Sequence, residues 1–211
     1  MTIRTVPASP IAVYQFTLTA ETNSKVYWDA VTYLLAQFPS IGASNVSAYT
    51  YLYPNTTAAQ LPGHQASFEV LFALVDPPSP STLADMWEPC WSHVNKTWPN
   101  QTVTSGQSIA FGNLYELFQK FADDSGAGVD KVVGSRLLPA ETLTDDAFHD
   151  ALIDFVGPAG ARLYMVSGKG VWNAKPRGGS NAVNPAWRKA LIHAGQSTEP
   201  SNITARRSDI S

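Results

Sequence analysis

Residues 65–75 place a large apolar side chain at every second position, and no other feature of the chain constrains its fold as strongly. Phe68, Val70, Phe72 and Leu74 fall on one face of an expected strand, because successive side chains of a strand point to opposite faces. Such a face is stable when helices or a second sheet cover it. The segment therefore predicts a central strand with one covered face.

The rest of the chain alternates between segments of period two and segments with helical spacing. Further strands are expected at Ile11–Thr19, Ser47–Tyr53, Ala161–Ser167, 101–110 and 131–138 and, as a strand or a short helix, at 187–193. Helices are expected from Thr22 or Asn23 to Phe38, from Ser81 with a kink or break at Pro89, from Asn113, and over Asp145–Val156 with Thr144 as the cap. This order predicts an α+β fold with a mostly antiparallel sheet and helices on one face. We expect one domain over residues 1–196 and a polar tail over 197–211.

Charge and cysteine content narrow the classes of function. The chain has 14 Lys and Arg against 17 Asp and Glu, a net charge of −3, and no basic face, so nucleic acid is not expected as a partner. No apolar run approaches the roughly 20 residues that span a bilayer, so no membrane partner is expected. Cys90 is the single cysteine, which rules out an intrachain disulfide and a cysteine zinc site.

The chain is rich in Asn-x-Ser/Thr sequons, the acceptor sequence for N-glycosylation. Ten Asn and 36 Ser and Thr residues predict roughly 1.7 sequons by chance. Five are present, at Asn45, Asn55, Asn95, Asn100 and Asn202. The excess favours glycosylation and passage through the secretory pathway, although loops rich in Thr and Asn would also raise the number. The first ten residues contain no apolar run typical of a signal peptide.

No catalytic or metal-binding motif stands out. The chain has no Gly-x-Ser-x-Gly elbow, and Gly168-Lys-Gly170 does not match a phosphate-binding loop. The pattern of residues 168–185 is instead typical of a flexible loop beside a cleft. No metal site is expected, because metal-ligand spacing is lacking among His64, His93, His149 and His193.

Aromatic and cationic side chains are concentrated near the sheet. Tyr49, Tyr51 and Tyr53 share one face of their expected strand, and Arg136 sits within the apolar segment Gly-Ser-Arg-Leu-Leu. If the tyrosines lie opposite the helix-covered face, they require a partner domain, a partner chain or a ligand to cover them. Packing under a loop is the alternative.

Four segments carry a resemblance to a known family. They are Val26–Ala30, Gly134–Pro139, Gly168–Gly170 and, most specific of all, Asn181–Arg188. They resemble fungal FAD-linked oxidoreductases of the berberine bridge enzyme-like group, over most of the chain from Ile11 to His193. The resemblance is to the substrate-binding domain that follows the flavin domain. It implies a broad antiparallel sheet with helices on one face, the other face covering flavin and substrate.

The resemblance also bears on the cofactor. In the family, a preceding domain with an Arg-Gly-Gly-His type loop holds FAD, and an Asn/Tyr-rich C-terminal strand contacts it; neither matches a segment of this sequence. Side chains alone do not perform hydride transfer. We therefore expect no cofactor for this chain alone, and FAD only if a flavin-binding partner exists.

Three functions stay open at this point. The first is a cofactor-independent cyclase of fungal secondary metabolism, by analogy with small hetero-Diels–Alderases, because a cycloaddition needs only an orienting apolar pocket and a donor to a substrate oxygen. The second is a substrate domain or subunit of an FAD-linked oxidoreductase. The third is a secreted small-molecule binding protein.

The candidate site lies over the sheet, walled by residues 168–185, and takes a small hydrophobic or aromatic substrate. The candidate donors are Arg136, Lys169 and Tyr51. Candidate substrate-binding residues are Tyr49, Phe72, Tyr164, Trp172, Trp187 and His193. For Arg136 the alternative is a salt bridge to an acid such as Glu69 or Asp154. A homodimer or larger oligomer is expected, because monomers rarely leave so large an aromatic face uncovered.

Overall fold

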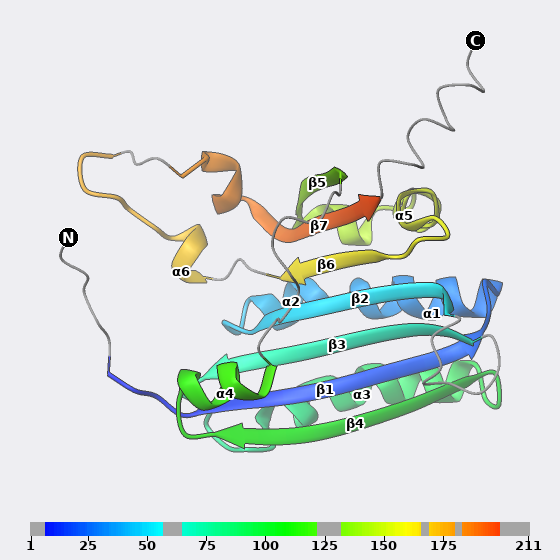
Figure 1. The fold of residues 1–211 in the computed structure, drawn as a ribbon, viewed down its shortest axis with the longest axis horizontal. Helices are drawn as coiled ribbons and strands as arrows, with labels where there is room; N and C mark the ends of the chain where they lie inside the picture. The colour runs from blue at the N-terminus through cyan, green and yellow to red at the C-terminus, as the bar shows by residue number, and fades with distance from the viewer. Residues whose placement is uncertain (1–6, 57–64, 122–131, 166–168, 180–182, 199–211) are drawn as a thin grey trace, which may run out of the picture.

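One seven-stranded sheet organises the molecule. The computed structural model describes residues 7–56, 65–121, 132–165, 169–179 and 183–198. Their strands follow the order β4-β1-β3-β2-β6-β7-β5, and all neighbouring strands are antiparallel (Figure 1). The predicted α+β fold with a mostly antiparallel sheet is confirmed.

The strands and the longer helices follow the predicted order, and α2, α6 and two 3₁₀ helices are additional. The strands are β1 (Ile11–Glu21), β2 (Ser47–Thr56), β3 (Gln65–Val75), β4 (Thr102–Phe111), β5 (Val132–Pro139), β6 (Ala161–Met165) and β7 (Ala190–Thr198). The helices are α1 (Lys25–Leu35), α2 (Phe38–Gly42), α3 (Thr82–Thr97), α4 (Leu114–Phe121), α5 (Phe148–Val156) and α6 (Lys169–Trp172), with 3₁₀ helices η1 (Ala140–Thr144) and η2 (Pro185–Arg188). The central strand β3 has the predicted bounds.

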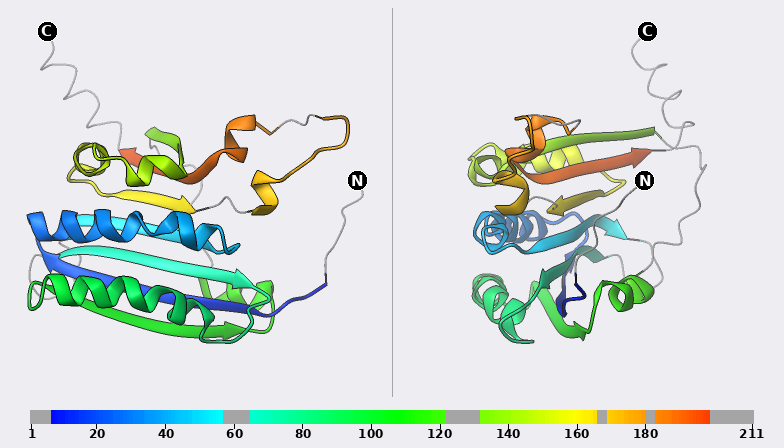
Figure 2. Two further views of the ribbon diagram at one scale, coloured as in Figure 1. Left: turned by 180° about the vertical axis from the view of Figure 1, so that it is seen from behind. Right: turned by 90° about the vertical axis from the view of Figure 1, so that its left-hand side faces the viewer.

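Helices α1, α2, α3 and α5 cover one side of the sheet, here called the helix face (Figure 2). The core lies beneath them. The Trp87 ring of α3 lies with its centroid 5.7 Å from that of Phe16 and 4.8 Å from that of Phe72, and all three side chains are buried. Burying an apolar side chain of this size stabilises a fold by about 1.5–3 kcal/mol. The alternating apolar residues of β3 are therefore buried beneath helices on one face, as their spacing predicts.

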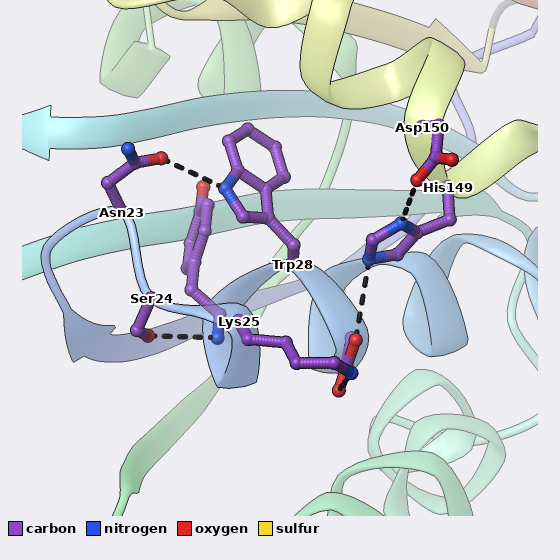
Figure 3. A network of polar contacts seen from close by, with 8 residues as sticks. Asn23, Ser24, Lys25, Trp28, His149 and Asp150 are labelled. Atoms are coloured by element: carbon purple, nitrogen blue, oxygen red, sulfur yellow. Dashed lines mark hydrogen bonds and ion pairs between the residues drawn. The ribbon is translucent and has the colours of Figure 1, made fainter.

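Two hydrogen bonds cap the start of α1 (Figure 3), and a third joins the helix to the sheet. The Ser24 hydroxyl accepts from the Tyr27 backbone N–H at 3.2 Å, the capping bond that helix N-termini prefer. Trp28 Nε1 donates to Asn23 Oδ1 at 3.1 Å. The buried Tyr27 hydroxyl donates to the Ser67 carbonyl of β3 at 2.8 Å. Helix α1 is thus tied to the centre of the sheet.

The sheet consists of two parts with a short joint. Residues 11–111 supply β4-β1-β3-β2, and residues 132–198 supply β6-β7-β5. The joint between β2 and β6 pairs five residues on each strand, from Ala48 with Met165 to Leu52 with Ala161. By comparison, β1 and β3 pair eleven residues on each strand.

A charged cluster joins the two parts on the helix face (Figure 3). The His149 ring of α5 lies between two acids: its Nδ1 is 2.8 Å from Asp150 Oδ1, and its Nε2 is 3.3 Å from Asp29 Oδ1 of α1. The Nδ1 contact is a hydrogen bond and the Nε2 contact is not, and both are ion pairs only when the His149 ring is protonated. Lys25 Nζ holds Asp29 Oδ2 at 2.6 Å.

Several local predictions are wrong at prolines and helix starts. The helix expected to run to Phe38 ends at Leu35, and Phe38 begins the separate helix α2. Pro39 lies in the first turn of α2, where the backbone N–H that proline lacks would have no partner within the helix. Pro89 lies inside α3, which is one helix over Thr82–Thr97 because its apolar side is buried. Thr144 ends η1, whereas α5 begins at Phe148 after Asp145 Oδ1 accepts from the Ala147 N–H at 2.8 Å.

The C-terminal region is also more regular than predicted. Residues 169–172 form α6 within the expected loop, and the segment 187–193 divides between η2 and β7. Strand β7 continues to Thr198, so the expected tail boundary at residue 197 falls inside a strand. The two-part division of the chain into domain and tail stays a prediction.

Helix α4 is the exception to the one-sided arrangement, since it lies on the opposite side of the sheet from α1 and α3 (Figure 2). Its Phe121 ring contacts that of Phe111 in β4 at 6.0 Å between centroids. Three of its large apolar side chains are exposed: Leu114, Tyr115 and Phe118. Within the described ranges, no helix is both long and apolar enough to cross a membrane.

Candidate functional site

The side of the sheet that Figure 1 presents to the viewer, here called the open face, carries the candidate site on β2, β6 and β7. Cross-strand neighbours point to the same face, so the register assigns residues to it. Tyr49 pairs with Tyr164, which pairs with His193. In the next row, Tyr51 pairs with Arg162, which pairs with Gly195. These rows lie on the face opposite Phe72.

An aromatic row crosses the open face. Ring centroids are 5.1 Å apart for Tyr49 and Tyr164, 6.1 Å for Tyr164 and His193, and 5.3 Å for His193 and Trp187. Aromatic pairs prefer centroid distances of about 4.5–7 Å, so each ring supports the next. Tyr49 is 54% exposed. The row offers ring surfaces to whatever covers this face.

A second group of rings lies beside this row. The Tyr51 and Tyr53 rings are parallel, with centroids 6.2 Å apart. The Arg162 guanidinium carbon lies 5.9 Å from the Tyr51 ring centroid, within the range of a cation–π contact. Burial raises the pKa of the Tyr53 phenol, the Glu69 carboxylate adds to the rise, and Arg162 opposes it. The phenol therefore stays protonated and able to donate a hydrogen bond near neutral pH.

A hollow of about 200 Å³ opens between β6, β7 and β5. Its polar side chains include Tyr53, Arg162, Tyr164 and His193, and its floor includes Gly195. The described residues that line it include no Asp or Glu. The arrangement can stack a planar group and donate hydrogen bonds to its oxygens.

The structure brings five of the nine predicted catalytic and substrate-binding residues together on or beside the open face: Tyr49, Tyr51, Tyr164, Trp187 and His193. Trp172 lies apart from them. Its Nε1 donates to the Ala190 carbonyl at 3.0 Å, and its ring packs against the core. The Lys169 side chain lies outside the described residues. Whether any of these residues binds substrate stays a prediction.

Two predicted site residues lie where they cannot line the open face. Phe72 is fully buried on the helix face against Phe38 and Trp87, because its alternation places it in the core. Arg136 pairs with Ala194, whose neighbour across β6 is the buried Leu163, so it also belongs to the helix face. Arg136 is exposed there.

The alternative expected for Arg136, a salt bridge to Glu69 or Asp154, is absent from the described residues as well. Glu69 instead accepts from the Ser67 hydroxyl at 2.8 Å. Strand β5 is at the sheet edge, where the exposed Arg136 side chain has no acid partner among the residues that the structure describes.

The predicted glycosylation sites differ in access. Asn45, Asn55 and Asn100 are exposed. Asn95 is half-buried on α3, and its amide exchanges hydrogen bonds with the Thr104 hydroxyl at 2.9 and 3.1 Å. Asn202 lies outside the described residues. Glycosylation and secretion stay predictions.

Nothing in the sequence identifies Arg162 or Gly195, the two residues that shape the hollow, as site residues. Arg162 lies in the short β6 segment Ala-Arg-Leu-Tyr-Met, where one polar residue in alternation with apolar ones is ordinary. That alternation alone would have placed Arg162 opposite Leu163. Its pairing with Tyr51 decides which face it occupies. In the described residues, no group of three His, Cys, Asp or Glu could hold a metal ion.

Comparisons with known proteins agree with this geometry. No protein-family model matches the chain. Over 204 residues it is 28% identical to an "uncharacterized FAD-linked oxidoreductase" of Arthroderma benhamiae, covering 92% of this chain and 34% of that protein. The VAO-type flavoprotein MtVAO713 of Myceliophthora thermophila superposes with a TM-score of 0.77 at 17% identity, over 91% of this chain and 34% of the other. The chain therefore shares the fold of the matching part of that flavoprotein.

The predicted resemblance to FAD-linked oxidoreductases is confirmed. Aclacinomycin oxidoreductase superposes with a TM-score of 0.60 at 19% identity, over 95% of this chain and 40% of that protein. The chain spans about a third of the length of the Arthroderma protein and of MtVAO713. The comparisons support the oxidoreductase-domain alternative for function over the cyclase.

Proposed function

We propose that this chain is the substrate-binding domain of an FAD-linked oxidoreductase and acts together with an FAD-binding domain. One observation carries the proposal: the face opposite the packed helices presents a continuous row of rings, Tyr49, Tyr164, His193 and Trp187. The match to an FAD-linked oxidoreductase over 92% of the chain supports it. A sheet face of this kind suits the wall of a site between two domains.

The described residues fit contact with the ring system of a flavin. Tyr49 is largely exposed and Tyr164 and His193 are half-buried, so their rings are available to a planar partner lying over the sheet. Such stacking stabilises bound aromatic rings. Bound FAD supplies the capacity to accept a hydride, which the side chains here lack.

The chain's own residues would bind and orient the substrate. The aromatic row aligns a planar substrate, and orientation of this kind lowers a reaction barrier by several kcal/mol. The Tyr53 phenol and the Arg162 guanidinium donate hydrogen bonds to substrate oxygens from the hollow. The helix face fixes the strands that hold these groups.

The cyclase hypothesis has weaker support. Of its expected donors, Arg136 lies on the helix face and the side chain of Lys169 lies outside the described residues, which leaves Tyr51. A secreted small-molecule binding protein would use the same hollow without chemistry. If this chain does not shield the flavin from iodide in the chimera experiment below, that alternative is favoured.

A chimera tests the proposal without a known substrate. This chain replaces the matching segment of the Arthroderma protein, and iodide quenching of flavin fluorescence measures how well the FAD is shielded. We expect shielding close to that of the unchanged protein. The double variant Tyr49→Ala/Tyr164→Ala should expose the flavin to iodide, whereas Arg136→Gln, on the helix face, should not. A folded chimera whose FAD is quenched like free FAD contradicts the proposal.

A homodimer through the open face is the second way to cover these rings, and we propose it for the chain in the absence of a flavin domain. The exposed apolar side chains of this face and of α4 include Tyr49, Val75 and Phe118, and soluble monomers rarely leave such patches open. Sedimentation should show a dimer that Tyr49→Asp dissociates. A monomer at micromolar concentration contradicts this.

A further inference from the structure

The hollow on the open face is lined by cationic and hydroxyl-bearing side chains. Arg162 and His193 line it together with Tyr53, Ser135 and Tyr164, three residues that carry hydroxyl groups. Its described lining includes no carboxylate, and within the described residues Arg162 forms no ion pair. The acid in the row of Arg162, Glu69, lies beyond Tyr51 on β3 and accepts a hydrogen bond from the Ser67 hydroxyl. A guanidinium in this setting lacks the partner that its fork of donors matches best, a carboxylate.

The shape of the hollow follows from one glycine. Arg162, Gly195 and Ser135 form a row across β6, β7 and β5. Neighbouring strands are about 4.8 Å apart, so roughly 10 Å of sheet separates Arg162 from Ser135. A Cβ added at Gly195 would meet no atom within 4 Å, so the space above this residue is open. It suits a ring lying flat on the sheet with its acid group at Arg162.

We infer that this hollow binds the carboxylate of a planar aromatic acid, with Arg162 pairing to the carboxylate and the tyrosine rings lining the aromatic part. The inference rests on the proposed function, because it names the chemical class of substrate that the domain would present. The 5.9 Å contact between Arg162 and the Tyr51 ring holds the cation at one side of the space. The carboxylate supplies the negative charge that the lining lacks.

Benzoate and its neutral analogue benzamide test the inference on the 211-residue chain, kept below the concentration at which sedimentation shows a dimer, so that the open face is uncovered. Ligand-observed NMR titration gives the dissociation constants. We expect benzoate to bind about tenfold more tightly than benzamide, as a charge-assisted bond contributes about 1.4 kcal/mol or more. Arg162→Gln should remove this preference and leave benzamide binding within about twofold of wild type.

Two matched controls separate the site from general effects. Arg136→Gln removes the other strand arginine, on the opposite face, and should leave benzoate binding unchanged. Gly195→Leu fills the hollow and should abolish binding of both probes, whereas Gly134→Leu, at an equally open position on the helix face of β5, should not. Circular dichroism and thermal melting establish that each variant is folded.

Three results overturn the inference: no detectable benzoate binding, equal binding of benzoate and benzamide, or unchanged benzoate binding in folded Arg162→Gln. Inorganic phosphate that competes as well as benzoate would also overturn it, because the aromatic ring would then contribute nothing. The titration contains no flavin. Its failure is therefore distinguishable from failure of the chimera, which reports on flavin shielding alone.

Discussion

The two faces of the sheet use the same strands for different purposes. On β3, Phe72 points to the helix face and is fully buried, whereas on the adjacent β2, Tyr49 points to the open face and is 54% exposed. The described strands contain two Arg or Lys residues. Arg136 lies on the helix face and Arg162 on the open face. Stability therefore resides on one face, and groups able to contact a ligand gather on the other.

The largest effect that separates the faces is expected at Phe72. Phe72→Ala leaves a cavity beside Trp87 and Phe38 and should lower the free energy of unfolding by about 3–5 kcal/mol. Tyr49→Ala, its control on the open face, should cost less than about 1 kcal/mol. Urea denaturation of the two variants measures the difference. Similar losses would show that the open face is packed as tightly as the helix face.

An intermediate loss of stability is expected from substitution of Tyr27, whose hydroxyl joins α1 to β3 by a hydrogen bond. Tyr27→Phe removes the donor to the buried Ser67 carbonyl and should lower the free energy of unfolding by about 1–2 kcal/mol. Tyr164→Phe on the open face, where solvent replaces any lost bond, should change it by less than about 0.5 kcal/mol. Urea denaturation compares the two, and a larger loss at Tyr164 would reverse the comparison.

The same tyrosine predicts a pH dependence. Burial raises the pKa of the Tyr27 phenol well above its usual value, so the folded chain holds this proton more tightly than the unfolded chain, whose tyrosines titrate near pH 10. The contribution of this phenol to the free energy of unfolding is therefore fully present below about pH 10 and is lost as the pH rises beyond it. The free energy of unfolding should fall less steeply with pH in Tyr27→Phe. Parallel curves for the two proteins would contradict this.

The smallest effect is expected at Arg136. From the sequence, a mid-strand arginine suggests either a catalytic donor or a buried ion pair, and Arg136→Met would then lower activity or stability strongly. On the exposed edge of the helix face, the same change should alter the free energy of unfolding by less than about 0.5 kcal/mol. A loss near 3 kcal/mol in thermal or urea unfolding would show a buried acid partner after all.

The sequence predicts the division into two faces but not their full membership. Alternation alone identifies Phe68 and Phe72 as one face of β3, and Tyr49 and Tyr51 as one face of β2. Assigning Arg136 requires the register through β2, β6 and β7, since β5 pairs with β7 at the edge. A shift of one residue in any of these pairings would move the arginine to the other face.

Residues outside the strands are harder to predict for a related reason. Trp172 carries a ring that suits a ligand, but its position depends on a long-range bond to the Ala190 carbonyl. Pro89 is a helix breaker by its intrinsic preference, yet the packing of Trp87 and Cys90 keeps α3 continuous. In both cases tertiary contacts outweigh the local signal.

The short joint between β2 and β6 has a consequence for synthesis of the protein. The four strands of residues 11–111 can pair as soon as they leave the ribosome, because chains fold from the N-terminus as they emerge. Until Ala161–Met165 appears, the partner edge of β2 has free backbone donors and acceptors and three tyrosines on one side. An uncovered edge of this kind pairs readily with other chains. The nascent protein therefore passes through an aggregation-prone interval, which ends when β6 pairs with the free edge of β2.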